Sequence, residues 1–315
     1  MTGSSAVYTS GQVTLREVGL RDGLQLVKEW PDTNAKRDWL DAEHQAGVRH
    51  FEIGSFLPAK RFPQFADISD VIQHVVDLGA AHSAALTLNE RGVEDAIGSG
   101  IDEIVCVVSA TEDHSQANMR RSRKEALELV RQACAQRDAL APGKIVNVGI
   151  AMAFGCTIAG EVLPGDVLQL AEKAFSAGAD MVGLADTIGY AGPAQIEALC
   201  REMTRVNTDA PLVIHLHDTR GMGIANAAAA LDSGVRILDA SLGGLGGCPF
   251  APGATGNIVF EDVVFLCERM GFATNIDVEA LNKARLIAEQ SMPSETFYGN
   301  VSRAGVPKNI TWQDR

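Results

Sequence analysis

Two histidines separated by one residue, His215 and His217, are the most distinctive chemical feature of the sequence. They lie in the run PLVIHLH (211–217), which has the character of a strand. Because side chains alternate between the two faces of a strand, both imidazoles point the same way. Two histidines on one face at the end of a strand supply half of a metal site. The alternative is a hydrogen-bonded pair of core histidines.

A glycine-rich segment follows, GGLGGCPFAPGATGN (243–257), and it carries Cys248 and Asn257. Six of its residues are glycine, and this composition predicts a mobile flap. Cys248 is the one cysteine in such a flexible setting, where a thiol near a cation is a candidate proton donor or acceptor. Its alternative role is that of a packed flap residue.

Eight short apolar runs recur along the chain, each followed by a loop and a segment of helix length. The runs are 13–18, 48–53, 82–88, 101–108, 144–152, 180–186, 211–217 and 235–242. Several follow a glycine stop, as in QAGVRH and SAGADM, which is typical of a helix that ends before a strand. Nearly continuous apolar strands indicate a buried parallel sheet. The eightfold rhythm therefore predicts an α/β protein, a (β/α)8 TIM barrel.

The amphipathic segments between these runs predict the helices of the barrel. We expect them near 34–46, 64–78, 90–98, 120–140, 165–177, 193–207, 221–233 and 258–270. A further C-terminal helix is expected at about 277–291, and no linker interrupts the chain. We expect a flexible arm over residues 1–12, a single barrel domain over 13–291 and a polar tail over 292–315.

Composition restricts the partners and the cellular compartment. The 315 residues are 46% hydrophobic and 21% charged, as in ordinary globular domains, and the net charge of −13 argues against a nucleic-acid partner. The six cysteines show no C-x-x-C spacing, which favours free thiols in a reducing compartment. We recognise no signal peptide and no membrane-spanning run, so we expect a cytoplasmic protein without a membrane partner.

Polar side chains follow the predicted strands at the end where TIM barrels carry out chemistry. Charged residues rarely end buried strands for stability alone, so their convergence on one mouth predicts a functional site. The residues delivered there are Arg21, Asp22, Glu52, Ser55, Thr87, Asn89, Ser109, Cys156, Asp186, Thr187, His215, His217 and Asp218.

Four of the predicted mouth and flap residues form a mixed nitrogen and oxygen donor set. Asp22, His215, His217 and Asn257 offer a carboxylate, two imidazoles and an amide oxygen. This set suits Mg²⁺ or Mn²⁺ at octahedral geometry, with Zn²⁺ less favoured.

Arg21 precedes the first of these donors, Asp22. A guanidinium in that place is suited to stabilising a developing oxyanion. Its alternative role is an ion pair with Glu52 or Asp186.

Together, these stretches resemble the 3-hydroxy-3-methylglutaryl-CoA lyase family, a group of metal-dependent TIM-barrel lyases and synthases. The resemblance extends from about residue 13 to 291 with the same order and spacing. The motifs are EVGLRDGLQ (17–25), FEIGSF (51–56), GLADTIG (183–189), HLHDTRG (215–221) and the glycine-rich segment 243–257.

The resemblance implies roles for the matching residues. Asp22, His215, His217 and Asn257 are similar to the metal ligands of the family, which use a divalent cation, Mg²⁺ or Mn²⁺. Arg21 is similar to the residue that stabilises the thioester enolate, and Cys248 to the catalytic flap cysteine. Glu52 and Asp186 match polar carboxylates beside the metal and the substrate, and Lys28 matches a lysine after the first motif.

The implied reaction is the retro-Claisen cleavage of an acyl-CoA substrate of the 3-hydroxy-3-methylglutaryl type to acetyl-CoA and acetoacetate. His215 and Cys248 are both candidates for proton transfer. We also expect a homo-oligomer, a dimer or a tetramer.

The chain departs from the family at two places near the expected acyl group. It reads Gly155-Cys156-Thr157-Ile158 where the family has Gly-Cys-Pro-Tyr, and Leu26-Val27 where close relatives carry polar residues. A different 3-hydroxy-3-acyl-CoA is therefore an alternative substrate. Two basic runs are candidates for contacts to the CoA phosphates. One is Lys60–Arg61, and the other comprises Arg120, Arg121, Arg123 and Lys124.

Three other functions compete with the lyase. One is an acyl-CoA/2-oxo acid condensing synthase, although such enzymes carry a Gly-Glu-Arg element where this chain has Cys248-Pro249-Phe250. The others are an aldolase without CoA and a non-catalytic barrel.

Overall fold

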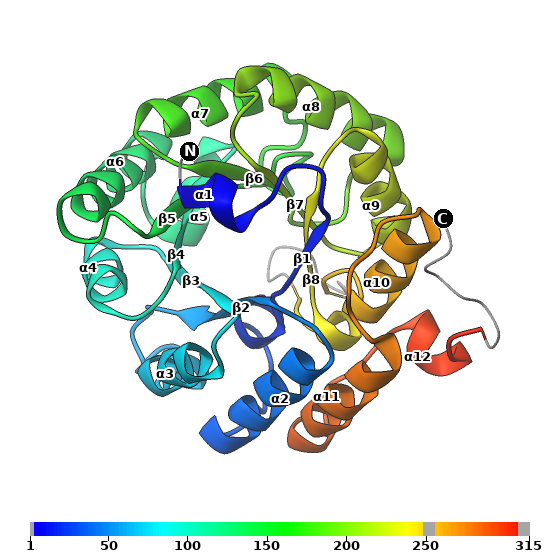
Figure 1. Cartoon of the computed structure of the whole chain (residues 1–315). Helices are drawn as coiled ribbons and strands as arrows, with labels where there is room; N and C mark the ends of the chain where they lie inside the picture. The colour runs from blue at the N-terminus through cyan, green and yellow to red at the C-terminus, as the bar shows by residue number, and fades with distance from the viewer. Residues whose placement is uncertain (1–2, 248–255, 308–315) are drawn as a thin grey trace.

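The computed structural model describes residues 3–247 and 256–307. Within them, parallel strands close into a barrel in the order β1 to β8, and β8 pairs with β1 (Figure 1). The strands are β1 (Thr14–Glu17), β2 (His50–Ser55), β3 (His82–Thr87), β4 (Glu103–Ser109), β5 (Ile145–Ala151), β6 (Met181–Asp186), β7 (Leu212–Leu216) and β8 (Ile237–Ala240). The predicted TIM barrel is confirmed.

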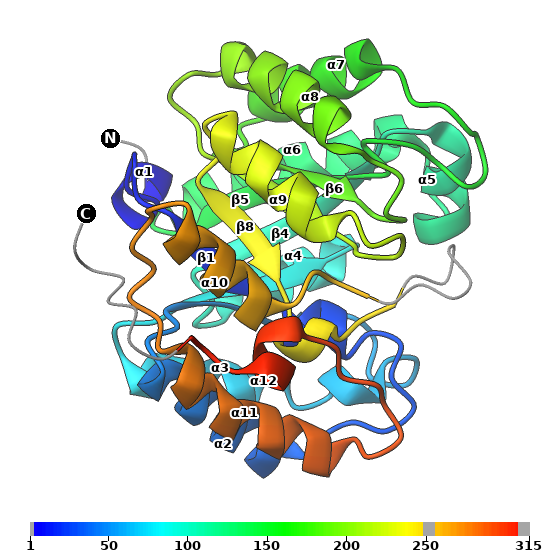
Figure 2. The ribbon, with the colours of Figure 1, turned by 90° about the vertical axis from the view of Figure 1, so that its right-hand side faces the viewer.

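Helices surround the barrel, and each predicted helical segment contains one. They are α2 (Thr33–Gln45), α3 (Ile68–Leu78), α4 (Glu90–Gly98), α6 (Arg123–Leu140), α7 (Pro164–Ser176), α8 (Pro193–Val206), α9 (Gly223–Asp232), α10 (Phe260–Arg269) and α11 (Val278–Ser291). Helix α11 lies beside α2 in both views of the ribbon (Figures 1 and 2). A backbone hydrogen bond of 2.7 Å from Asp277 N to Ala46 O joins the start of α11 to the end of α2.

Two predicted helices begin clearly later than expected, α3 at Ile68 instead of 64 and α6 at Arg123 instead of 120. A separate helix α5 (Glu112–Met119) precedes α6 and ends at Arg120, which adopts a left-handed conformation with φ 53°. A capping box between Ser122 and Glu125 then starts α6. The reciprocal hydrogen bonds of this box satisfy backbone donors at the new helix start, so the chain turns instead of continuing as one helix.

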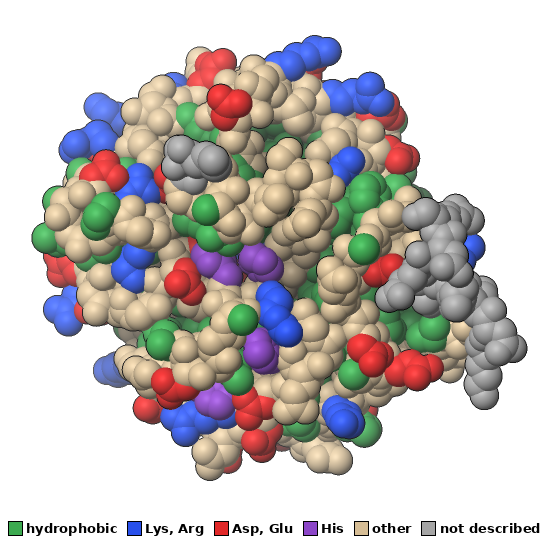
Figure 3. Space-filling view, in the orientation of Figure 1, with side chains coloured by type: hydrophobic (Ala, Val, Ile, Leu, Met, Phe, Trp, Pro, Cys, Tyr) green, Lys and Arg blue, Asp and Glu red, His purple; other side chains and the backbone are tan. Residues whose placement is uncertain are grey.

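The N-terminal residues close one end of the barrel. Residues 3–7, part of the expected arm, form the short helix α1 (Gly3–Val7), and Tyr8 beyond it is buried against Ile145 and Val213. The Tyr8 ring also stacks on His50 with centroids 5.3 Å apart. The space-filling view from this side shows histidine side chains near the middle of the face (Figure 3).

The residues after α11 also contribute to the fold. Met292 is fully buried, and a short helix α12 (Asn300–Ala304) places Val301 against the body of the protein. Asp262 accepts hydrogen bonds from the backbone nitrogens of Asn300 and Val301, so α12 is tied to α10. Figure 2 shows α12 between α10 and α11.

One continuous apolar core fills the layer between the barrel and its helices. Trp39, Leu40, Val130 and Phe260 are among its fully buried members. Because the closed sheet leaves no exposed strand edge, the loops at the strand ends are held by a rigid frame.

No helix in the described ranges has both the length and the apolar character required to cross a bilayer.

Candidate active site

The turn after β1 presents the first two polar residues of the site. This π-type turn, η1 (Gly19–Gly23), contains Arg21 and Asp22. It depends on Gly19, because a Cβ there would lie 2.6 Å from Glu17 Oε1 and 2.9 Å from the Trp39 ring. Glu17 Oε1 accepts a hydrogen bond of 2.9 Å from Gly19 N, which fixes the start of the turn.

Three predicted metal ligands lie together at the mouth of the barrel. Ligand atoms of Asp22, His215 and His217 are all within 4.8 Å of one another. His217 Nε2 lies 3.5 Å and His215 Nε2 3.9 Å from Asp22 Oδ2, and the two ring nitrogens are 3.1 Å apart. His215 is on β7, whereas His217 follows the strand and pairs by an isolated β-bridge with Asn257.

Asn257 completes the predicted donor set. Its Nδ2 lies 2.8 Å from Asp22 Oδ2 and 2.9 Å from Leu245 O, and its Oδ1 is buried without a hydrogen-bond partner among the described residues. An unpaired buried amide oxygen beside a carboxylate and two imidazoles fits a cation that prefers oxygen and nitrogen ligands. The residues present therefore fit a divalent metal.

The electrostatics of this cluster favour a charged carboxylate. Burial by itself raises the pKa of the Asp22 carboxyl, but the Arg21 guanidinium and the two imidazoles outweigh it and hold the pKa well below its ordinary value. Burial lowers the pKa of His215, whereas the carboxylates of Asp239 and Asp22 raise it, and the net shift is upward. Asp22 is thus ionised at neutral pH, as a metal ligand must be.

Arg21 is held between two carboxylates. Its guanidinium forms an ion pair with Asp22 on one side and lies 2.7 Å from Glu52 Oε2 on the other. Burial raises the pKa of Glu52, and Arg21 opposes that shift. The predicted alternative role of Arg21, an ion pair with Glu52, is thus present, and the Arg21 side chain stays 13% exposed at the mouth.

Asp186 has a different set of contacts. Its carboxylate accepts hydrogen bonds from the backbone nitrogens of Tyr190 and Ala191, at 2.8 and 3.0 Å. Burial nevertheless raises the pKa of this carboxyl. These contacts shape the loop after β6.

Two further predicted residues lie outside this cluster. Lys28 is exposed beyond η1, and its backbone nitrogen donates to Glu295. Cys248 lies outside the described residues.

The segments that depart from the family lie on loops at the same mouth. A Cβ at Gly247 would lie 3.7 Å from Leu26 Cδ1, so Leu26 is close to the root of the glycine-rich segment. In the loop after β5, the Cys156 sulfur accepts a hydrogen bond of 3.3 Å from Thr111 Oγ1, and Ile158 is exposed.

The basic runs considered for CoA phosphates differ in their contacts. Arg121 forms a bidentate ion pair with Glu90, at 2.6 and 2.8 Å, so its guanidinium is engaged. Lys60 and Arg61 are exposed on the loop after β2.

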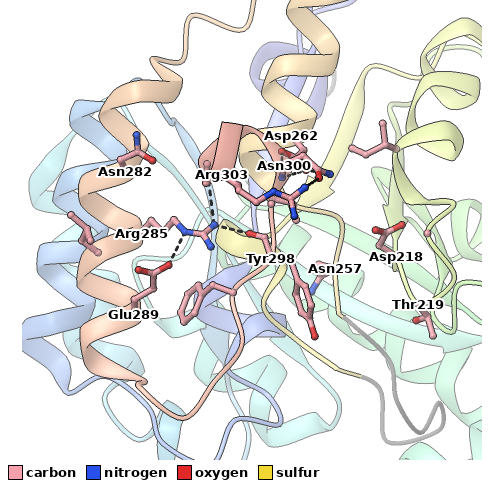
Figure 4. Close-up of a pocket in the computed structure, with 17 residues that line it drawn as sticks. Asp218, Thr219, Asn257, Asp262, Asn282, Arg285, Glu289, Tyr298, Asn300 and Arg303 are labelled. Carbon is pink, nitrogen blue, oxygen red and sulfur yellow. Dashed lines mark hydrogen bonds and ion pairs between the residues drawn. The ribbon is translucent and has the colours of Figure 1, made fainter. Parts of the chain in front are cut away.

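A cleft of about 870 Å³ lies beside the site and shares Asn257 with it (Figure 4). Asp218 and Thr219 from the loop after β7 line one side, and side chains of α11 and α12 line the other. Arg285 crosses this wall and is engaged by Glu289 at 2.8 Å and by the backbone oxygen of Tyr298 at 2.7 Å. The cleft is not lined by Asp22 or the two histidines, so it adjoins the metal cluster without containing it.

Sequence reasoning missed two buried residues behind the metal cluster, Arg16 and Asp239. Asp239 Oδ2 lies 3.1 Å from His215 Nδ1, and Arg16 pairs with the same carboxylate at 2.6 Å. A charged residue inside each of two short apolar runs, VTLREV and VRILDASL, was the signal that could have found them.

Comparison with known proteins agrees with this architecture. The HMGL-like family model matches residues 12–287. Hydroxymethylglutaryl-CoA lyase YngG of Bacillus subtilis (strain 168) is 36% identical over 281 residues, which cover 89% of this chain and 93% of that protein. (R)-citramalyl-CoA lyase of Chloroflexus aurantiacus is 40% identical over 281 residues, covering 85% and 87% of the two chains.

A solved structure shows the same fold. An HMG-CoA lyase from Acinetobacter baumannii, in complex with coenzyme A and 3-methylmalate, superposes with a TM-score of 0.87. Sequence identity is 32%, and the match covers 95% of this chain and 97% of that one. With the family model spanning the barrel and relatives above 30% identity along nearly the whole chain, the protein belongs to the HMGL-like family and is a lyase.

Proposed function

We propose that this lyase cleaves a 3-hydroxy-3-methylglutaryl-CoA-type thioester to acetyl-CoA and acetoacetate. The observation that carries the proposal is the grouping of Asp22, His215 and His217 within 4.8 Å at the barrel mouth, beside Arg21, in a chain similar to HMG-CoA lyases. We assign a divalent cation, Mg²⁺ or Mn²⁺, to these three residues and Asn257.

The proposed reaction breaks one carbon–carbon bond. A bound divalent cation would supply Lewis acidity that lowers the pKa of the substrate's tertiary hydroxyl. Loss of that proton turns C3 into the ketone carbon of acetoacetate, and the electrons of the C2–C3 bond move into the thioester to form the acetyl-CoA enolate. A proton added at C2 then completes acetyl-CoA.

Each remaining demand of this reaction has a candidate residue. The Arg21 guanidinium donates to the enolate oxygen, where negative charge develops in the transition state. His215 and Cys248 are the candidates for the two proton transfers. Glu52 orients Arg21 through their 2.7 Å contact.

Two predicted substrate contacts belong to the same proposal. We assign Lys28, which is exposed beyond η1, to an anionic part of the acyl-CoA. Asp186 acts on the substrate side by holding the loop after β6 through its two amide contacts. We also propose a homo-oligomer, a dimer or tetramer, in the cytoplasm, which size-exclusion chromatography with light scattering and cell fractionation would test.

A second candidate substrate is a citramalyl-CoA-type thioester. The 40% identity with (R)-citramalyl-CoA lyase and the altered loop at 155–158 favour it. This substrate has a carboxylate attached directly to the hydroxyl-bearing carbon, so the same bond cleavage would release pyruvate in place of acetoacetate.

Product analysis separates these functions. Purified protein with Mg²⁺ or Mn²⁺ is incubated with each thioester, and acetyl-CoA, acetoacetate and pyruvate are measured by mass spectrometry. Acetoacetate from the methylglutaryl thioester supports the first proposal, and pyruvate from the citramalyl thioester the second. Free CoA released from acetyl-CoA plus a 2-oxo acid, without cleavage of either thioester, would establish the condensing synthase instead.

A further inference from the structure

A chain of buried polar side chains runs through the barrel from its closed end to the metal cluster. Its centre is Arg16 on β1, whose side chain is 4% exposed. Arg16 Nη1 lies 2.6 Å from Glu103 Oε1 on one side. On the other side Arg16 Nε and Nη2 lie 2.6 and 3.1 Å from the two carboxylate oxygens of Asp239. Three nitrogens of the guanidinium thus contact two carboxylates, and these contacts fix its orientation.

Asp239 in turn contacts a predicted metal ligand. Its Oδ2 lies 3.1 Å from His215 Nδ1, and its side chain is 5% exposed. A carboxylate paired with arginine on both oxygens is ionised and only accepts hydrogen bonds. His215 Nδ1 must therefore carry the proton, which leaves the lone pair of Nε2 directed at Asp22 and His217.

The second histidine of the site has no such partner. His217 Nδ1 is buried without a hydrogen-bond partner among the described residues. The two imidazoles thus differ: His215 is held by a carboxylate at its Nδ1, whereas in the described part of the chain His217 is contacted only at Nε2, by Asp22 and His215. Of the two histidines, Asp239 therefore contacts His215 and not His217.

We propose that Asp239 is a positioning residue of the metal site, held in place by Arg16, and that it fixes His215 with Nε2 as the free donor. The inference rests on the proposed metal site. It assigns Asp239 no contact with substrate. Carboxylates that hold metal-bound histidines commonly change metal affinity by about 10- to 100-fold when removed.

The substitution Asp239→Asn tests the tautomer directly. Arg16 only donates hydrogen bonds, so it holds the single oxygen of the new amide and turns the NH2 group toward His215. His215 Nδ1 must then accept, and the proton moves to Nε2, where it blocks metal binding. The side chain keeps its size, so packing around it is little changed.

Asp180→Asn provides a matched control. Asp180 also pairs with a buried arginine, Arg137, and accepts a hydrogen bond of 2.8 Å from Val146 N, but no histidine contacts it in the described structure. This variant carries the same chemical change in the same barrel. It should lower the melting temperature and leave metal affinity unchanged.

The experiment measures Mn²⁺ binding to the full-length protein by calorimetry and by the electron paramagnetic resonance of free Mn²⁺. The wild type should bind Mn²⁺, and Asp22→Ala should not bind it. Asp239→Asn should raise the Kd for Mn²⁺ by about 10- to 100-fold. Asp180→Asn should match the wild type. Nitrogen-15 shifts of labelled histidine in the metal-free protein, assigned with His215→Gln, should place the His215 proton on Nδ1.

The outcomes are distinguishable. If the wild type binds no Mn²⁺, the proposed metal site fails and the inference fails with it. If the wild type binds and Asp239→Asn binds equally well, the site stands and the positioning role is overturned. If Asp239→Asn does not fold, the wild-type spectrum decides: a proton on Nδ1 of His215 supports the inference, and a proton on Nε2 overturns it.

Discussion

The Arg21 guanidinium lies 2.7 Å from the Glu52 carboxylate, which joins the turn after β1 to strand β2 at the barrel mouth. Glu52 is almost completely buried, whereas the Arg21 side chain remains 13% exposed. Together with Asp22, Glu52 therefore sets the orientation of the guanidinium before substrate arrives. Donors organised in advance stabilise developing charge without a reorganisation cost during the reaction.

Replacing Arg21 by methionine should affect the chemical step more than binding. A guanidinium adds little to a neutral thioester carbonyl and much to an enolate oxygen. We expect Arg21→Met to lower kcat by about 10²–10³-fold or more, with little change in KM. Metal content, measured by plasma emission spectrometry, should stay near normal. If the variant loses its metal, Arg21 serves to hold Asp22 and the enolate assignment is wrong.

Glu52→Gln should have a smaller effect of the same kind. The amide keeps the volume of the side chain and removes the charge that orients Arg21. We expect kcat to fall by about 10-fold, less than for loss of an oxyanion donor itself. Metal content is the internal control, because Glu52 is not among the proposed ligands. Unchanged kcat would show that Asp22 alone orients the guanidinium.

Metal binding should stabilise the fold measurably. A ligand that binds only the native state at 100 times its Kd adds about 2.7 kcal/mol to the free energy of unfolding. Mn²⁺ should therefore raise the melting temperature of the wild type but not that of His217→Ala. Calorimetric scans with and without Mn²⁺ give the answer. Equal upward shifts in both proteins would place the cation elsewhere.

The barrel could be predicted because its signals are local. Glycine stops before apolar runs, such as QAGVRH, mark several of the helix-to-strand turns, and the order of apolar runs and helical segments defines the eightfold repeat. The capping box Ser122–Glu125 was an equally local signal, and it explains why α6 begins after Arg120. Helix α12 was not predicted, because its attachment depends on Asp262 contacting a segment far along the chain.

The metal cluster could be predicted because each strand delivers its last residues to the same mouth. The contact of Arg16 with Asp239 could not be predicted from the sequence, because the two residues are 223 positions apart. They meet only because β1 pairs with β8 when the barrel closes. Asp186 shows a related difficulty. Its substrate-side role stays a prediction, and the hydrogen bonds of its carboxylate to two backbone amides appear only in the folded loop.

The free energy of unfolding should fall as the pH rises toward the raised pKa of a buried carboxyl, that of Glu17. Burial raises the pKa of Glu17 to about 8, although the amides of Leu242 and Gly19 oppose the shift. Because the pKa of Glu17 is higher in the folded state, its protonated carboxyl contributes fully to stability below the unfolded-state pKa of about 4.3. That contribution is lost as the pH rises through the folded-state pKa of about 8.

Between pH 6 and 8 this group should lower the free energy of unfolding by about 2 kcal/mol. Glu17→Gln keeps the acceptor oxygen for Gly19 and Leu242 and removes the titration. Denaturant unfolding at pH 6, 7 and 8 should show a smaller decline for the variant. Identical slopes for both proteins would exclude Glu17 as the source.

Cys248 should be the thiol through which alkylation stops turnover, although it lies outside the described residues. The five other cysteines are buried, and burial raises the pKa of Cys106 to about 11 and that of Cys134, Cys200 and Cys267 to about 12. Thiols react as thiolates, so those four should react slowly at neutral pH. Iodoacetamide should therefore modify Cys248 first, as read by peptide mapping.

The substitution Cys248→Ser should lower kcat, because a hydroxyl is a far weaker acid than a thiol, and it should leave metal content unchanged. It should also remove the remaining activity's sensitivity to iodoacetamide. The matched control is Cys156→Ser, whose buried sulfur accepts a hydrogen bond from Thr111 and whose replacement should leave that sensitivity in place. If Cys248→Ser retains full kcat, its thiol is structural, and the proton at C2 must come through a histidine or water.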